Sequence, residues 1–306
     1  MTSSCQVHLM RAAATVLLLR ESAGELEVLM MRRGASLAFM AGMWVFPGGR
    51  VDAADATAAI RDRVSPDARD SWRGRLRSPL GDPLPDEAAL ALHVAACRET
   101  FEESGVLLAR DRHGAPCPAE LAARLQPERE AVAGRAAAFV ELLEREDLYL
   151  DLAPLVYWSH WITPSLEPKR FDTRFFAIAV PPDQAASADL GELTEHAWVR
   201  PTRLQEALER REIRVVPPTL LTLEDLDESH ARHGALAAML EAERGRPTPP
   251  VMPRIEPRTD EFRVVMPWDP DYAAIPGEGC LPEGGFPPHL LRRRSCLSVA
   301  RDREAR

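Results

Sequence analysis

The sequence predicts an α+β domain in which a mixed β-sheet lies between layers of helices. Two observations predict this class. Short β-type runs and longer helical stretches are mixed along the 306 residues, and they do not follow the regular βαβ alternation that a doubly wound parallel sheet requires. The hydrophobic fraction of 45% and the charged fraction of 28% are ordinary for a globular protein, so the chain has enough apolar side chains to build a core.

The first predicted elements are a hairpin and a short strand. The runs 14–19 (ATVLLL) and 26–31 (LEVLMM) are separated by ESAGE, which predicts two paired strands. WVFPGG, residues 44–49, predicts a strand that ends in a turn. Residues 56–85 are polar and contain several prolines, so we expect an insertion there, with a helical first part.

The best predicted helix covers 86–104. We expect Asp86 to cap its N-terminus and Gly105 to end it in the left-handed conformation. Further helical stretches are predicted at 119–146 (divided at Pro127), 201–210, 216–226 and 230–244, and strands at 155–162, 171–180, 195–199 and 262–266. Prolines recur after Arg246, which predicts a main domain over 1–246 and a Pro/Gly-rich extension over 247–306.

Charge and cysteine content exclude several functions. The net charge is −9 and Lys169 is the only lysine, which argues against a nucleic-acid partner and against a Walker-type phosphate loop. The five cysteines form no Cys-x-x-Cys pair, so we expect reduced thiols. The apolar run 12–19 is too short to span a membrane. We therefore expect a cytoplasmic protein with a small-molecule substrate and no membrane partner.

Three carboxylates crowd onto about one turn of the predicted helix: Glu99, Glu102 and Glu103. A solvated face is one interpretation. The side that carries them also carries small and apolar residues, namely Ala88, Leu92, Ala95 and Ala96, while Leu90, Val94, Cys97 and Phe101 form the core stripe. This pattern favours a pocket lined with carboxylates. Packed acidic oxygens are tolerated when a hard divalent cation neutralises them, and Mg²⁺ or Mn²⁺ suits such a site.

These residues resemble a Nudix box, the signature in which a glycine and a glutamate precede Arg-Glu-U-x-Glu-Glu-x-Gly-U, with U aliphatic. Gly49 matches the opening glycine, and residues 98–106 (RETFEESGV) match the second half in the right spacing. There are three departures. Asp55 stands where the first glutamate is expected, Phe101 occupies an aliphatic position, and the seven-residue spacer is 42 residues long, 56–97.

The resemblance implies a Nudix fold over about 10–245 and hydrolysis of a diphosphate linked to another moiety, with Mg²⁺ or Mn²⁺. It implies that Glu99, Glu102 and Glu103 hold metal, with the carbonyl of Gly48, and that Arg98 fixes the geometry between loop and helix. Glu195 is the candidate general base, with Glu192 second. Either could instead be an exposed loop residue.

The branch of the family most similar to this chain has an interrupted box and includes diphosphatases of coenzyme A and acyl-CoA, which release 3′,5′-ADP and phosphopantetheine species. A separate coenzyme A signature is matched in part, by Arg33 and Gly42, with Ala38 in place of an arginine. The candidate substrate-binding residues are Arg32, Arg33, Arg170, Arg174 and Gly49. Two alternatives stay open: a pyrophosphatase for ADP-ribose or dinucleotides, and a non-catalytic Nudix-fold binding module.

Overall fold

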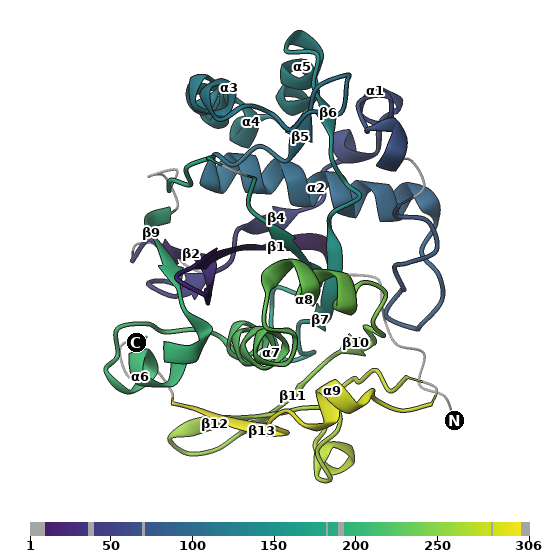
Figure 1. Ribbon diagram of the computed structural model, residues 1–306. Helices are drawn as coiled ribbons and strands as arrows, with labels where there is room; N and C mark the ends of the chain where they lie inside the picture. Colours follow the sequence, from purple (N-terminus) through teal and green to yellow (C-terminus); the bar gives the residue numbers. More distant parts are fainter. Residues whose placement is uncertain are drawn as a thin grey trace.

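The computed structural model describes residues 10–35, 40–68, 71–181, 183–188, 193–282 and 284–300. Over these residues the chain forms a large mixed sheet with helices on both faces, and a smaller sheet lies at one end of the molecule (Figure 1). The predicted α+β class with a mixed sheet between helices is therefore confirmed.

The predicted hairpin forms the centre of the sheet. β1 (Arg11–Ser22) and β2 (Glu25–Arg33) pair antiparallel. Ala23 and Gly24 in the turn both have positive φ, 52° and 78°, as a two-residue hairpin turn of the type that matches the strand twist requires. The other edge of β1 pairs in parallel with β8 (Phe171–Ala179), so β1 is central.

The predicted strand at 44–49 divides into two. β3 (Trp44–Val45) pairs with β2, whereas β4 (Gly48–Arg50) pairs with β1. Pro47 lies between them and has no N–H with which to continue a ladder, and its carbonyl accepts a hydrogen bond from Val16 at 2.8 Å. The division places the two glycines of FPGG next to β1.

The remaining strands extend the main sheet or form small sheets. They are β5 (Ala109–Arg110), β6 (Tyr149–Leu150), β7 (Val156–Ile162), β9 (Leu193–Val199), β10 (Pro250–Val251), β11 (Arg254–Pro257), β12 (Glu261–Val265) and β13 (Cys296–Ala300). Within the described ranges the main sheet has the order β10-β7-β8-β1-β2-β3, with β4 on β1 and β9 on β2, while β5-β6 and β11-β12-β13 are separate.

Alternate residues of β1 point into two different cores, as the period of a strand dictates. Val16 and Leu18 pack with α2 (Asp86–Ser104), whereas Leu17 and Leu19 pack with α7 (Pro217–His233) and α8 (Leu236–Glu243). The α2 side also carries η2 (Ala53–Ala56), α1 (Ala58–Asp62), η3 (Pro66–Ala68), α3 (Ala119–Arg124), η4 (Gln126–Glu128), α4 (Arg129–Gly134) and α5 (Ala137–Arg145). The remaining helices are η5 (Pro201–Arg203), α6 (Leu204–Glu209), η6 (Tyr272–Ala274) and α9 (Pro288–Leu291).

Two details of the helix predictions need correction. α2 has the predicted bounds and ends at Gly105 (φ 72°), but Asp86 does not cap it. Pro85 occupies the N-cap position, and the Asp86 carboxylate pairs with Arg73 at 3.2 Å. The predicted break between 226 and 230 is also wrong. α7 continues until Gly234, whose φ of 73° ends it, because no glycine or proline interrupts the segment earlier.

The extension beyond residue 246 packs against the main sheet. β10 adds to the edge of β7, and side chains of Val251, Val264 and Leu297 belong to the core that contains α7 and α8. The division into 1–246 and 247–306 stays a prediction about folding units. No helix within the described ranges is long and apolar enough to cross a membrane.

Candidate active site

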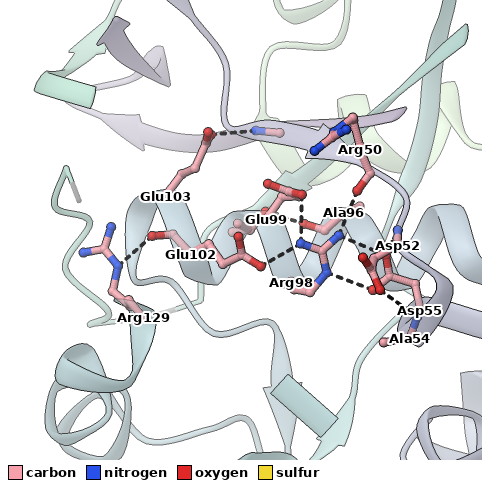
Figure 2. A network of polar contacts seen from close by, with 12 residues as sticks. Arg50, Asp52, Ala54, Asp55, Ala96, Arg98, Glu99, Glu102, Glu103 and Arg129 are labelled. Atoms are coloured by element: carbon pink, nitrogen blue, oxygen red, sulfur yellow. Dashed lines mark hydrogen bonds and ion pairs between the residues drawn. The ribbon is translucent and has the colours of Figure 1, made fainter. Parts of the chain in front are cut away.

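Arg98 lies at the centre of a buried cluster between α2 and the loop after β4 (Figure 2). Its Nε and Nη2 donate to the two oxygens of Asp55, both at 2.9 Å. Its Nη1 donates to Glu99 at 2.8 Å and to Glu102 at 2.6 Å, and Nη2 also donates to the carbonyl of Arg50 at 2.8 Å. One planar guanidinium therefore joins helix and loop through a fork that a lysine ammonium lacks.

Asp55 is 2% exposed and holds the loop in shape. Its Oδ2 accepts from the backbone N–H of Asp52 at 2.8 Å, while the Asp52 side chain accepts from Ala54 at 2.9 Å. This reciprocal pattern is a capping box at the start of η2. Although 42 residues separate Asp55 from Arg98 in the chain, the two side chains meet. The long spacer thus leaves the loop half of the site in contact with the helix half.

The glutamates carry more negative charge than Arg98 can neutralise. Burial raises the pKa of Glu99 to about 7, although Arg98 opposes this. Burial also raises the pKa of Glu102, again against Arg98. The Glu103 side chain points away from Arg98 and toward β4 (Figure 2). Its Oε2 accepts a hydrogen bond from the backbone N–H of Gly48 at 2.8 Å. Three carboxylates surround one guanidinium, and a fourth lies one residue further along α2.

Glycines let the β4 backbone approach these carboxylates. A Cβ on Gly49 would lie 2.4 Å from Oε2 of Glu99. At Gly48, whose φ is 155°, a Cβ would lie 2.4 Å from the carbonyl oxygen of Ala14. Both positions therefore require glycine for space, and Gly48 also for its backbone conformation.

The donor set fits a hard divalent cation by its chemistry, because it is all oxygen and has surplus negative charge. In the described part of the chain, however, no group of three or more His, Cys, Asp or Glu side chains is arranged so that it could hold a metal ion as it stands. The reason is visible in the contacts: Arg98 holds oxygens of Glu99 and Glu102, and Gly48 holds one of Glu103. Glu99 and Glu102 each have a second carboxylate oxygen that Arg98 does not hold.

A family model, the NUDT19 Nudix domain, matches residues 8–226 of this chain. The chain belongs to the Nudix hydrolases. The resemblance of its sequence to the Nudix family, and to the branch with coenzyme A diphosphatases, is thus confirmed.

Relatives and a solved structure agree with this assignment. A chicken (Gallus gallus) protein named acyl-coenzyme A diphosphatase NUDT19 is 32% identical over 256 residues, covering 70% of this chain and 67% of its own length. The human protein of that name is 31% identical over 216 residues, covering 62% of this chain and 58% of its own length. A crystal structure of a Nudix hydrolase from Alicyclobacillus acidocaldarius matches with a TM-score of 0.58 and 27% identity, over 78% of this chain and 98% of that one. The match thus spans only 58 to 67% of the length of these two relatives.

The Nudix helix is more deeply packed than its sequence suggests. The sequence predicts that Ala88, Leu92, Ala95 and Ala96 line a pocket beside the glutamates. In the structure the last three are core residues, and Ala88 is exposed. The prediction of a pocket-lining face is therefore wrong. Since α2 lies between the sheet and α3–α5 (Figure 1), it needs small residues on the side away from the sheet for packing.

Arg129 is a residue of the Nudix site that the sequence did not reveal. It is 8% exposed, and its Nε donates to the backbone carbonyl of Glu102 at 2.9 Å (Figure 2). Its Nη1 donates to the hydroxyl of Ser187 at 3.0 Å. A cation at the C-terminal end of a helix offsets the negative end of the helix dipole. No local sequence pattern marks Arg129 as part of the site. The capping box of Asp52 and Asp55, by contrast, has a recognisable spacing from which it could have been predicted.

The candidate general base lies on β9. Glu195 is exposed, and its carboxylate forms an ion pair with Arg32 at 3.0 Å. Glu192 falls outside the described residues. Arg33 lies next to a register shift between β2 and β9. These positions do not test the roles of Glu195, Arg32 and Arg33 in catalysis or substrate binding, so those roles stay predictions.

Arg170 and Arg174 make intramolecular contacts. Arg170 directly precedes β8 and pairs with Glu278 of the extension at 2.9 Å. Arg174 is 1% exposed; its Nη1 pairs with Asp172 at 2.5 Å and its Nη2 donates to the carbonyl of Arg77 at 2.6 Å. Their role in substrate binding stays a prediction, and both guanidinium groups already hold strand β8 to its surroundings.

Proposed function

We propose that this Nudix protein hydrolyses the diphosphate of coenzyme A or acyl-CoA to 3′,5′-ADP and (acyl-)phosphopantetheine, with Mg²⁺ or Mn²⁺. The observation that carries the reaction is the buried cluster of Asp55, Glu99 and Glu102 around Arg98, with Glu103 beside it. The substrate class is supported by the two acyl-coenzyme A diphosphatases to which the chain is 31 to 32% identical.

The metal would be held by Glu99, Glu102 and Glu103, with the carbonyl of Gly48. Bound there, a divalent cation neutralises the charge of the diphosphate and of the entering oxygen. Arg98 and Asp55 do not need to touch substrate in this scheme. They hold α2 against the loop, so that the glutamates and the β4 backbone keep fixed positions.

Glu195 is the proposed general base, and its exposure on β9 leaves its carboxylate accessible to water. The charge of coenzyme A calls for guanidinium groups, which bind phosphate through two parallel hydrogen bonds. Arg33, Arg170 and Arg174 are the proposed contacts, together with the backbone of Gly49. A small-molecule substrate and a cytoplasmic location belong to the same proposal.

The test is a hydrolysis panel with purified full-length chain, Mg²⁺ or Mn²⁺, and separation of products. The substrates are coenzyme A, an acyl-CoA, dephospho-CoA, ADP-ribose and NADH. Glu103→Gln removes charge but keeps an oxygen that accepts from Gly48. Glu87→Gln is the matched control, because Glu87 is exposed on the first turn of the same helix.

We expect 3′,5′-ADP from coenzyme A, lost in Glu103→Gln and retained in Glu87→Gln. A preference for coenzyme A over dephospho-CoA identifies an enzyme that recognises the 3′-phosphate. Cleavage of ADP-ribose or NADH alone would replace the substrate class and keep the reaction. Metal binding without any turnover would favour the binding module instead.

A further inference from the structure

A large cavity lies away from the Nudix glutamates. It has a volume of about 1480 Å³ and is formed by three segments that are distant in sequence. Residues 74–82 of the insertion, 244–250 before and within β10, and 279–282 and 284–288 of the extension meet there, with His93 of α2 and the start of β7. Pockets for small ligands commonly have about 300–1,000 Å³, so this space accepts a molecule of that size.

The described lining is rich in arginine. Arg75, Arg77, Arg244 and Arg246 face it, and Asp82 is the one acidic residue among the lining residues that the structure describes. Arg246 is neutralised by Asp225 at 2.6 Å, and Arg244 pairs with Glu241 at 3.3 Å.

The two arginines of the insertion, unlike Arg244 and Arg246, have no charged partner in the described part of the chain. Arg75 and Arg77 are exposed, and neither guanidinium has an ion pair or hydrogen bond with any residue in the described ranges. The Arg77 backbone is held in place, because its carbonyl accepts from the buried Arg174 at 2.6 Å. Two guanidinium groups with no partner in the described part of the chain therefore line one cavity, where both are available to donate hydrogen bonds to an oxyanion.

Apolar side chains accompany the arginines. Leu80 is 67% exposed and Leu281 is 68% exposed, although both line the cavity. Leu80 belongs to the insertion and Leu281 to the extension. Leu155 and Phe286 add apolar surface within the same lining. Exposed large apolar side chains gathered at one cavity are typical of a binding surface.

We propose that this cavity binds an amphipathic phosphate monoester, with its phosphate on Arg75 and Arg77 and its apolar chain against Leu80 and Leu281. The site is separate from the proposed catalytic centre. His93 precedes Glu99 and Glu103 by six and ten residues, which is roughly 9–15 Å along a helix. The phosphate monoester belongs either to a separate phosphorylated amphiphile or, if the proposed function holds, to the 3′-phosphate of coenzyme A, whose adenosine would then take the place of the apolar chain.

The test is calorimetric titration of the full-length chain with dodecyl phosphate below its micelle concentration, in EDTA. Metal chelation makes the result independent of the proposed hydrolysis. Arg75→Ser/Arg77→Ser is the test variant. Arg61→Ser is the matched control, because Arg61 is an exposed arginine of the same insertion that does not line the cavity. Thermal unfolding of each variant verifies its fold.

We expect the double variant to bind dodecyl phosphate at least tenfold more weakly, and Arg61→Ser to bind like the wild type. Dodecyltrimethylammonium, which has the same chain with a cationic head, should not bind. Leu80→Ser should weaken binding of dodecyl phosphate but not of ethyl phosphate. Equal affinity in the double variant, binding of the cationic amphiphile, or no binding to the wild type would each overturn the proposal.

A competition arm identifies the source of the ligand. If coenzyme A in EDTA displaces dodecyl phosphate, the cavity receives the 3′-phosphate end of the proposed substrate. If it does not, while the arginine dependence holds, the ligand is a second molecule. Both results require the Arg75/Arg77 site, and they assign it to one ligand or the other.

Discussion

Two buried arginines of this Nudix protein have opposite surroundings. Arg98 and Arg174 are 4% and 1% exposed. Arg98 contacts three carboxylates, those of Asp55, Glu99 and Glu102. Arg174 contacts one, that of Asp172, and otherwise donates to backbone carbonyls. The first cluster has surplus negative charge and the second is balanced.

The difference separates two uses of a buried arginine. A balanced pair leaves no net charge for an external ion to neutralise. A cluster with surplus carboxylates is left with a deficit of positive charge. Under the proposed function, a cation bound beside this cluster would therefore add to stability.

Removing Arg98 should produce the largest effect. Arg98→Met leaves three buried carboxylates without their cation, and we expect the free energy of unfolding to fall by about 3–5 kcal/mol. Urea denaturation measures this, and added Mn²⁺ should restore part of the loss. Arg61→Met, on the exposed face of α1, should change stability by no more than about 0.5 kcal/mol. A loss in Arg98→Met as small as that of the control would contradict the charge argument.

Substitutions of Arg174 and Asp172 test whether the second cluster is balanced in charge. Arg174→Met leaves the Asp172 carboxylate without its arginine and with His160 as its neighbour, and it should cost about 3 kcal/mol in the free energy of unfolding. The double variant Arg174→Met/Asp172→Asn removes both charges and should recover most of that loss, because neither partner remains unpaired. Denaturant unfolding of both variants measures the recovery. Without recovery, the network would depend on more than charge balance. KM values on the same proteins test the proposed contact of Arg174 with substrate.

Acidification should weaken the balanced cluster. His160 shares the Asp172 carboxylate at 2.6 Å and faces Arg174, and burial lowers the pKa of His160 to about 4, from an ordinary 6.5. The unfolded chain therefore binds more protons between these values, so stability falls as pH decreases from 6.5 to 4, by about 2–3 kcal/mol from this group. The expected pH dependence can be measured by comparing the free energy of unfolding of the wild type and of His160→Gln across that pH range. The two curves would run parallel if another group were responsible.

The smallest expected effect on stability concerns Gly49. In Gly49→Ala the new Cβ displaces the Glu99 carboxylate, which lies 2.4 Å from its position. We expect about 1 kcal/mol less stability and, under the proposed function, roughly tenfold weaker Mn²⁺ binding, equivalent to about 1.4 kcal/mol. Gly134→Ala is the control, since a Cβ added at Gly134 would have no other atom within 4 Å among the described residues. Equal Mn²⁺ affinity in both variants would place the metal away from Glu99.

The sequence predicted those parts of the molecule that depend on local signals. The bounds of α2, its glycine end and the β1–β2 hairpin follow from periodicity and turn residues. Contacts across long separations could not be predicted. The bidentate pairing of Asp55 with Arg98 depends on how the insertion returns, and the burial of Arg174 depends on β8 lying between β1 and β7. A strand with neighbours on both edges and helices on both faces buries even its polar side.

The contact between Asp55, which directly precedes the insertion, and Arg98, on the helix that follows it, also joins the chain on the two sides of the insertion. Loop-closure entropy grows only with the logarithm of length, and doubling a flexible loop costs about 0.6 kcal/mol. Because two parallel hydrogen bonds join the residues on either side of the insertion, its exposed loops can change in length at little cost in loop-closure entropy. The insertion is therefore a site where new binding surface can evolve while the arrangement of the glutamates stays the same.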